Sequence, residues 1–243
     1  MLYSIALYLY KPSDMKPKVI AIDGHSSTGK SSLAKKIAKA LGYVHIDTGA
    51  IYRAVALFAI ENNMISKDKK IAEKELNQAL PEIHINFEMN ESTGVNEVRL
   101  NGRNVEDKIR SMEVSNVVSQ VAKLPEIRKH LVKLQREIAQ NTGVVMDGRD
   151  IGSVVFPAAP VKIFLTASPQ VRASRRYQEL RSNGVEISME EVEKNINQRD
   201  FLDTQRSASP LIKADDAIEI NNDFKDQQGT FQTVMNIIRE KGF

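Results

Sequence analysis

The fold of this chain is decided by the stretch Val19-Ile20-Ala21-Ile22-Asp23-Gly24-His25-Ser26-Ser27-Thr28-Gly29-Lys30-Ser31-Ser32. Its β-branched, apolar start predicts a strand, and a helical pattern follows from Ser32 to Leu41. The spacing G-x-x-x-x-G-K-S/T between them predicts a phosphate loop. In such a loop the first backbone N–H groups of the helix and the Lys30 ammonium bind phosphate oxygens. The Ser31 hydroxyl then lies where it could ligate a Mg²⁺ ion held by the same phosphates.

Length and composition restrict the class of protein. The chain has 243 residues, 42% of them hydrophobic, a net charge of +3 at pH 7 and no cysteine. The lack of cysteine excludes disulfides and cysteine-ligated zinc, and we expect a cytoplasmic protein. Without a basic tail, an RNA-binding aromatic motif or a zinc finger, the mild basic excess favours soluble anionic metabolites over nucleic acid.

The start of the chain has a different character. Residues 1–10 are mostly apolar, but the run is too short to span a membrane and lacks the basic leader and cleavage site of a secretory signal. We therefore expect no membrane attachment. We interpret residues 1–16 as an extension and expect translation to begin at Met15 in the cell.

Strand and helix patterns alternate along most of the chain. The expected elements are strands at 19–22, 43–46, 144–146, 161–166 and 217–220, and helices at 32–41, 48–62, 114–121, 127–138 with Pro125 in its first turn, 169–181, 189–202 and 224–239. A phosphate loop after the first strand of such a series is typical of an α/β fold with a doubly wound parallel sheet. Ligands of that fold bind at the carboxyl ends of the strands.

The segment 63–124 departs from this alternation. Lys67–Leu80 predicts a charged amphipathic helix, Ile83–Glu88 and Glu97–Leu100 alternate as half-buried strands, and Asn101-Gly102 is a strong hairpin signal. We expect a small antiparallel sheet with helices, inserted into the parallel fold. The expected division of the chain is an extension at 1–16, a core at 17–62, 125–167 and 188–243, an insertion at 63–124 and a lid at 168–187.

Charged residues follow several strands. Arg53 lies in the first turn of a helix, where the helix dipole disfavours a cation, so it either faces solvent or binds an anion. Asp147 ends a buried strand, where it could hold Mg²⁺ or water beside a nucleotide. Arg172, Arg175 and Arg176 share one helix face with no acidic residue four positions before any of them. Together these residues predict one crevice that binds several anions, as phosphoryl transfer between two phosphates requires.

Five segments, in order along nearly the whole chain from Lys18, carry a more specific resemblance. They are Ile-Asp-Gly-His-Ser-Ser-Thr-Gly-Lys-Ser (22–31), Asp-Thr-Gly-Ala-Ile-Tyr-Arg (47–53), Asp-Gly-Arg-Asp-Ile-Gly-Ser-Val-Val-Phe-Pro (147–157), Lys-Ile-Phe-Leu-Thr-Ala-Ser (162–168) and Arg-Asp-Phe-Leu-Asp-Thr-Gln-Arg (199–206). This series resembles the bacterial cytidylate kinases, a family of phosphate-loop nucleoside monophosphate kinases. The resemblance implies phosphorylation of CMP and dCMP by ATP with Mg²⁺, an insertion that binds the monophosphate, and a short mobile lid.

The resemblance also implies roles for individual residues. The ATP phosphates are expected at Gly24, His25, Ser26, Ser27, Thr28, Gly29, Lys30, Ser31 and Ser32, and the metal at Ser31 and Asp147. The CMP phosphate is expected at Ser26, Arg53, Arg149 and Arg206, the cytosine at Ser119, Arg128 and Asp150, and the ribose at Arg199 and Asp203. The expected catalytic groups are Lys30, Arg149, Arg172, Arg175 and Arg206. A carboxylate and a guanidinium can satisfy both hydrogen-bonding edges of cytosine, whereas uracil would place a carbonyl against Asp150.

Two positions depart from the pattern of this family, which usually has Pro at the position of His25 and Gly at that of Ser27. We expect right-handed backbone geometry at Ser27, and a loop side chain near solvent rather than a catalytic base at His25. A uridylate or thymidylate kinase is an alternative, disfavoured by the large insertion and by the segment 199–206. A nucleotide-dependent regulatory switch is another, and its GTPase form is weakened by the lack of an Asn-Lys-x-Asp motif. We expect a monomer whose partners are ATP, CMP and dCMP.

Overall fold

The computed structural model describes residues 18–66, 68, 70–90, 92, 95–140, 142–223 and 227–243. The expected N-terminal extension and the expected start at Met15 lie outside these residues. Among the described helices, none has both the length and the apolar character needed to cross a membrane.

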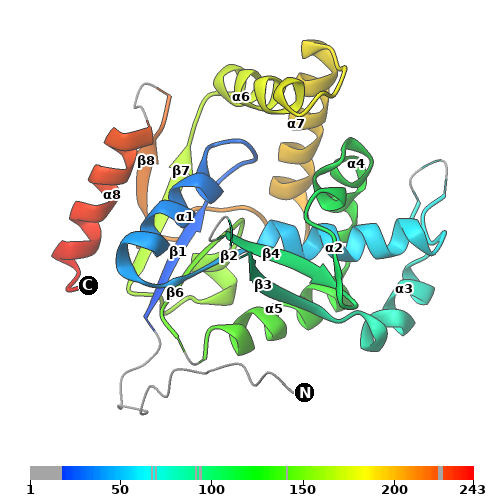
Figure 1. Cartoon of the computed structure of the whole chain (residues 1–243), viewed down its shortest axis with the longest axis horizontal. Coiled ribbons are helices and arrows are strands. Elements are labelled where there is room, and N and C mark those ends of the chain that lie inside the picture. Colours follow the sequence, from blue (N-terminus) through cyan, green and yellow to red (C-terminus); the bar gives the residue numbers. More distant parts are fainter. Residues whose placement is uncertain are drawn as a thin grey trace.

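A five-stranded parallel sheet forms the centre of the molecule (Figure 1). Its strands lie in the order β2, β6, β1, β7, β8, which confirms the doubly wound topology. Their bounds are β1 Val19–Asp23, β2 Val44–Asp47, β6 Val144–Gly148, β7 Val161–Thr166 and β8 Ile218–Asn221. The register places Asp147 of β6 opposite Asp47 of β2 on one side and Ile22 of β1 on the other. The carboxyl ends of these three strands, and the loops that follow them, therefore meet at one edge of the sheet.

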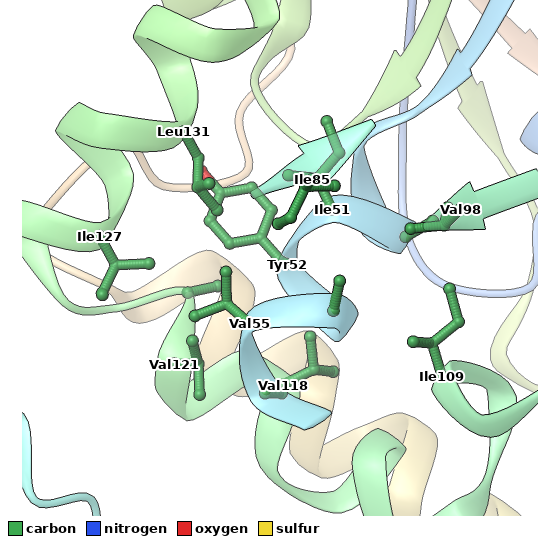
Figure 2. Close-up of a cluster of buried hydrophobic side chains, with 14 of the residues drawn as sticks. Ile51, Tyr52, Val55, Ile85, Val98, Ile109, Val118, Val121, Ile127 and Leu131 are labelled. Atoms are coloured by element: carbon green, nitrogen blue, oxygen red, sulfur yellow. The ribbon is translucent and has the colours of Figure 1, made fainter. Parts of the chain in front are cut away.

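Helices cover both faces of this sheet. On one face, α1 (Lys30–Leu41) and α8 (Gln227–Glu240) pack against a fully apolar cluster that includes Ile20 and Ile22. On the other face, α2 (Thr48–Glu61), α4 (Met112–Val121) and α5 (Pro125–Ile138) enclose the larger cluster. Figure 2 shows this cluster around Tyr52, with side chains from α2, α4 and α5 pointing toward one another. Each sheet face is thus buried, as the continuous apolar strands of the sequence require.

The segment 63–124 forms the expected antiparallel sheet, made of β3 (Ile85–Asn90), β4 (Val95–Leu100) and β5 (Arg103–Asn104). Asn101 and Gly102 connect β4 and β5 with positive φ angles of 49° and 79°, as a tight hairpin of this kind needs. The buried side chains of this sheet belong to the same apolar cluster as α2 and β6. The small sheet therefore has no separate core.

One expected helix is shorter in the structure. The prediction of a helix from Lys67 to Leu80 is wrong in its first half, because α3 covers only Glu73–Ala79 and a 3₁₀ turn follows at Leu80–Glu82. Before α3, Ile65 and Ile71 form an isolated antiparallel bridge, and Ser66 N–H donates to Lys70 O at 2.9 Å. This backbone pairing replaces the first turns of the expected helix, and both isoleucines are half-buried against the larger cluster.

The helices α6 (Pro169–Ser182) and α7 (Met189–Gln205) pack against each other at the top of Figure 1, beyond the phosphate loop. The expected capping box is present: the Ser188 hydroxyl accepts from Glu191 N–H, and the Glu191 carboxylate accepts from Ser188 N–H at 2.9 Å. The two helices share a small apolar cluster, made of Ala173, Leu180, Val192 and Ile196, and Met112 of α4 packs against it. This pair therefore has an apolar cluster separate from the two larger ones and contacts α4 through it.

Candidate active site

A cavity of about 390 Å³ lies at the carboxyl edge of the parallel sheet. Lys30 and Arg53, which are 23 positions apart in the sequence, both line it. The sequence-predicted site residues in its walls are Ser26, Ser27, Gly29, Lys30, Ser31, Ser32, Arg53, Ser119, Arg128, Asp147, Arg149, Asp150, Arg199, Asp203 and Arg206. Residues from all parts of the chain thus meet in one place, as the expectation of a single crevice requires.

The phosphate loop is shaped by two glycines and one buried lysine. Gly24 has a φ of 146°, and a Cβ there would lie 2.1 Å from Leu165 O, so no larger residue fits. Gly29 has a φ of 96° and directly precedes α1. The Lys30 ammonium is buried and donates to His25 O across the loop. The loop therefore curls around the lysine, and the first N–H groups of α1 open toward the cavity.

Ser27 departs from the expectation for its backbone. Its φ is 61°, so the prediction of right-handed geometry is wrong. The loop is held on both sides of Ser27: His25 O accepts from Lys30 and Thr28, and Thr28 O accepts from Asn222 at 2.8 Å. These hydrogen bonds fix a left-handed turn in which successive N–H groups can converge on an anion, whichever residue stands there. A serine in this region costs roughly 1–2 kcal/mol relative to glycine.

His25 belongs to the loop, but its side chain does not line the cavity. Its side chain is 27% exposed, and its Nδ1 lies 3.2 Å from Asp200 Oδ1 on α7. Asp200 also pairs with Arg172, whose Nη1 lies 2.6 Å from Asp200 Oδ2. The guanidinium of Arg172 donates further to Ala167 O at 3.0 Å and to Ser26 O at 3.4 Å. Arg172 is therefore bound to protein groups and, in this conformation, does not line the cavity.

The other two arginines of the predicted set, Arg175 and Arg176, face different spaces. Arg176 lines the cavity and pairs with Glu179 at 2.9 Å, so its neutralising partner follows it in the sequence. Arg175 lines a second cavity of about 640 Å³ beside the phosphate loop. Its guanidinium donates to Asn222 O at 2.7 Å and to Thr28 O at 3.2 Å. Arg175 thus joins α6 to the phosphate loop at the rim of this second space.

Acidic and basic side chains pair with one another in the wall of the same cavity. Asp150 forms a buried ion pair with Arg128, and its other oxygen lies 3.8 Å from Arg206 Nη2. Arg149 Nε lies 2.9 Å from Asp203 Oδ2. These pairs bring α5, α7 and the end of β6 together. They also hold each guanidinium in a fixed orientation without using all of its donors.

The cavity concentrates positive charge. Burial and the neighbouring Arg149 lower the pKa of Lys30 to about 7. Burial and Arg199 hold the pKa of Arg53 well below its usual range, and burial and Arg149 lower the pKa of Arg199 to about 10. Guanidiniums stay charged at neutral pH even so. The buried nitrogens without a hydrogen-bond partner include Nε of Arg128, Arg176 and Arg199 and Nη2 of Arg206. Unpaired donors and excess charge in one cavity suit a phosphate.

The expected metal ligands lie side by side. Ser31 Oγ donates to Asp147 Oδ2 at 2.7 Å, and both residues line the cavity next to Lys30. Two oxygen donors of this kind fit Mg²⁺, which keeps several waters and takes further ligands from substrate phosphates. Among the described residues, no group of three His, Cys, Asp or Glu side chains gathers to hold a metal by itself. The donor set therefore fits an ion that arrives with a nucleotide.

Several contributors to the site are missing from the sequence-based expectations, among them Arg110, Tyr52 and Asp23. Arg110 lines the cavity, 3.5 Å from Asp47 Oδ2, although it stands in a 3₁₀ turn of the insertion. The ring of Tyr52 lies under the Arg128 guanidinium at 5.5 Å. The carboxylate of Asp23, whose pKa burial raises to about 6, accepts from Ile151 and Gly152 N–H at 2.8 and 2.7 Å.

These three contacts have different signals in the sequence. The Asp23 contact holds the π-helical turn Ile151–Val155 that follows Asp150. An Arg before a helix with an acidic residue four positions earlier, and a Tyr next to Arg53, are weak signals. The π-helical turn has no recognisable pattern at all.

Comparison with known proteins gives a consistent result. A family model described as cytidylate kinase matches residues 20–240. A protein of Flavobacterium johnsoniae named cytidylate kinase is 51% identical over 226 residues, covering 93% of this chain and 98% of its own. Proteins of the same name from Flavobacterium psychrophilum and Parabacteroides distasonis are 50% and 52% identical, over 92% and 86% of this chain and 99% and 90% of theirs.

Proposed function

Since the chain belongs to the cytidylate kinase family, we propose that it transfers the γ-phosphoryl group of ATP to CMP and dCMP, producing CDP and dCDP. The observation that carries the proposal is a single cavity lined both by the phosphate-loop lysine and by the paired arginines and carboxylates. Two anions bound in this cavity would have their phosphates near each other. Such proximity supplies a large part of the catalysis of a reaction between charged groups.

Donor binding is supported by the loop geometry. The N–H groups that open α1 and the Lys30 ammonium would bind the ATP phosphates. The second cavity, lined by Arg175 and by Asn222 from the end of β8, adjoins the loop and has room for the adenosine. A guanidinium beside this space can stack on a base as well as pair with phosphate.

Acceptor binding is supported by the arginines of the first cavity. Arg53, Arg149 and Arg206 would hold the CMP phosphate together with Ser26, because planar guanidiniums pair bidentately with phosphate oxygens. An incoming phosphate would also offset the repulsion among these buried cations. Burial is the main cause of the lowered pKa of Arg53, and the charge of Arg199 lowers it further. Burial likewise lowers the pKa of Arg206, and the charge of Arg128 adds to this effect.

The base and the ribose would lie deeper in the same cavity. Asp150 and Arg128 are each about 4% exposed and present an acceptor and donors in one buried pair, with Ser119 nearby in the cavity lining. Cytosine offers an amino donor beside two acceptors, which this pair can match. Arg199 and Asp203 of α7 would then bind the ribose hydroxyls.

The reaction needs no general base from the protein, because the attacking CMP phosphate is already an anion. Lys30, Arg149 and Arg206 would neutralise the charge that spreads over the oxygens of the transferring group. Arg176, which also lines the cavity, would add a further cation from α6. Ser31 and Asp147 would hold Mg²⁺, which would supply positive charge to neutralise the phosphates. Movement of α6 and α7 over both nucleotides would exclude water.

The experiment that tests this function is ADP production with CMP, dCMP, UMP, dTMP and AMP, each supplied separately with ATP. We expect turnover with CMP and dCMP and its loss in Lys30→Ala. Turnover confined to UMP or dTMP would favour the alternative kinases. ATP binding without transfer to any monophosphate would favour a regulatory switch and would overturn the proposal.

A further inference from the structure

His45 is a buried histidine of β2 that has no role in the function proposed above. Its side chain is 10% exposed, and its Nε2 lies 2.7 Å from Asp147 Oδ1. The other oxygen of the same carboxylate accepts from Ser31 Oγ at 2.7 Å. A single carboxylate therefore connects a histidine inside the protein to a hydroxyl that lines the cavity.

The sheet register explains how this chain of contacts forms. In the parallel pair β2 and β6, Asp47 lies opposite Asp147 and His45 lies opposite Val145. Side chains two positions apart share a face of the sheet, so His45 and Asp147 are diagonal neighbours on that face. Val145 belongs to the apolar cluster that α1 covers, and Ser31 is the second residue of α1. The three side chains consequently meet between the sheet and the start of that helix.

The protons shared by His45, Asp147 and Ser31 have only one consistent arrangement. A carboxylate accepts hydrogen bonds and does not donate them, so both Nε2 of His45 and Oγ of Ser31 must donate to Asp147. The proton of the Ser31 hydroxyl is then committed to Asp147, and its lone pairs are left for a cation. Each oxygen of Asp147 also keeps a second acceptor position. The backbone of His45 is fixed as well, because Asn96 of β4 donates to His45 O at 3.3 Å.

We propose that His45 is a positioning residue for the metal that accompanies ATP. It holds Asp147 in one orientation, and Asp147 in turn directs the lone pairs of Ser31 toward the cavity. Partners behind metal ligands typically contribute 10- to 100-fold to metal affinity, because without them the ligand must be ordered when the metal binds. The inference rests on the proposed function, since it needs a divalent cation at Ser31 and Asp147. If His45 acts in this way, a lower concentration of the metal is enough for tight ATP binding.

The test measures metal binding rather than turnover. Mn²⁺ is titrated by electron paramagnetic resonance into the full chain saturated with the β,γ-imido analogue of ATP. In His45→Leu we expect Mn²⁺ affinity to fall about tenfold. In His45→Gln, whose amide can donate from nearly the same place, we expect recovery to within about threefold of wild type. Ile46→Val is the matched control, because Ile46 is the next residue of β2 and lies on the opposite face in the other apolar cluster.

Two comparisons separate positioning from a merely structural role. In an Asp147→Asn background, His45→Leu should cause no further loss of Mn²⁺ affinity, and a further tenfold loss would overturn the inference. In the wild-type chain, the ¹⁵N resonances of the His45 ring should show Nε2 protonated and should shift when Mg²⁺ and the analogue bind. A resonance that does not respond overturns the inference even if a variant fails to fold.

The possible results also distinguish failure of the inference about His45 from failure of the proposed function on which it rests. If wild type and His45→Leu bind Mn²⁺ within twofold of each other, His45 has no positioning role while the proposed function stands. If wild type itself binds no Mn²⁺ in the presence of the analogue, both are overturned. A loss in Ile46→Val as large as that in His45→Leu would assign the effect to general stability and would also overturn the inference.

Discussion

The buried Lys30 ammonium leads to a quantitative prediction about protons. In the free protein, burial and the nearby charge of Arg149 lower the pKa of Lys30 to about 7, so the amine is largely neutral at pH 8. Phosphates bound at the loop would place negative charge against it and return its pKa toward the ordinary value near 10.5. Binding a nucleotide triphosphate at pH 8 should therefore take a proton from solution.

The size of this effect follows from the two pKa values. At pH 8 a group with a pKa of about 7 is roughly one-tenth protonated, so binding should take up about 0.9 proton. At pH 6 the amine is already charged, and uptake should be about 0.1 proton. The affinity for the triphosphate should accordingly be flat below pH 7. It should fall by up to tenfold for each pH unit above 7, which corresponds to about 1.4 kcal/mol of binding free energy per unit.

The lowered pKa of Lys30 affects folding stability in the opposite direction from nucleotide affinity: stability increases as pH rises. A lysine whose pKa is lowered in the folded state is protonated more readily when unfolded. Between about pH 7 and pH 10.5 the unfolded chain then binds the extra proton, so this group makes the free protein relatively more stable as pH rises. Comparison of wild type with Lys30→Met across this range isolates the contribution from those of the other titrating groups.

Isothermal titration calorimetry measures the proton uptake directly. The imido analogue of ATP, without metal, is titrated at pH 6 and pH 8 in buffers of different ionisation enthalpy, and the slope of the binding enthalpy gives the protons exchanged. Lys30→Met should take up close to none at either pH. An uptake near zero for wild type at pH 8, or an equal uptake in Lys30→Met, would refute the reasoning.

Three further changes have definite expected outcomes. Asp150→Asn should reduce the preference for CMP over UMP, measured as the ratio of kcat/KM values, by at least about tenfold, because the new amide can donate to the uracil carbonyl. An unchanged ratio would show that Asp150 has no part in base recognition. Ser27→Gly should raise the free energy of unfolding by about 1 kcal/mol, because the left-handed backbone then no longer carries a Cβ. This corresponds to a rise in Tm of roughly 2–4 °C in calorimetry, and a lower Tm would contradict the prediction. Gly24→Ala should lose several kcal/mol of stability and fail to bind the imido analogue, because the added methyl meets Leu165 O; near-normal binding would show that the loop can be rebuilt.

Most of the parallel fold could be predicted because local patterns and the overall topology agree. β7 occupies the expected residues, and Asp47, Ser168 and Ser188 all cap helices as their side chains suggest. The insertion is harder to predict, because its amphipathic pattern does not show where the helix begins. A bridge between Ile65 and Ile71, which depends on contacts outside the helix, replaces its first half.

The candidate site also has features that could be predicted from the sequence and features that could not. Its lining could be predicted because phosphate chemistry needs particular residue types at strand ends, and the topology brings those ends together. Three features depend on contacts across the fold that no local pattern reveals. They are the left-handed turn at Ser27, the engagement of Arg172 with Asp200, and the contact of His45 with Asp147. The first follows from hydrogen bonds to neighbouring carbonyls, and the other two join residues from different elements.

The common core of the two sheets limits how this protein can be rearranged. Ile85 of β3 and Val98 and Leu100 of β4 pack in the same cluster as Ile51 and Val55 of α2. Excision of the hairpin would expose that flank of α2 to water. It would also remove Val98, whose N–H donates to the Glu106 carboxylate that pairs with Arg110. Chimaeras that exchange this region between relatives must therefore carry the facing side chains of α2 with it, or substrate preference and folding yield will be lost together.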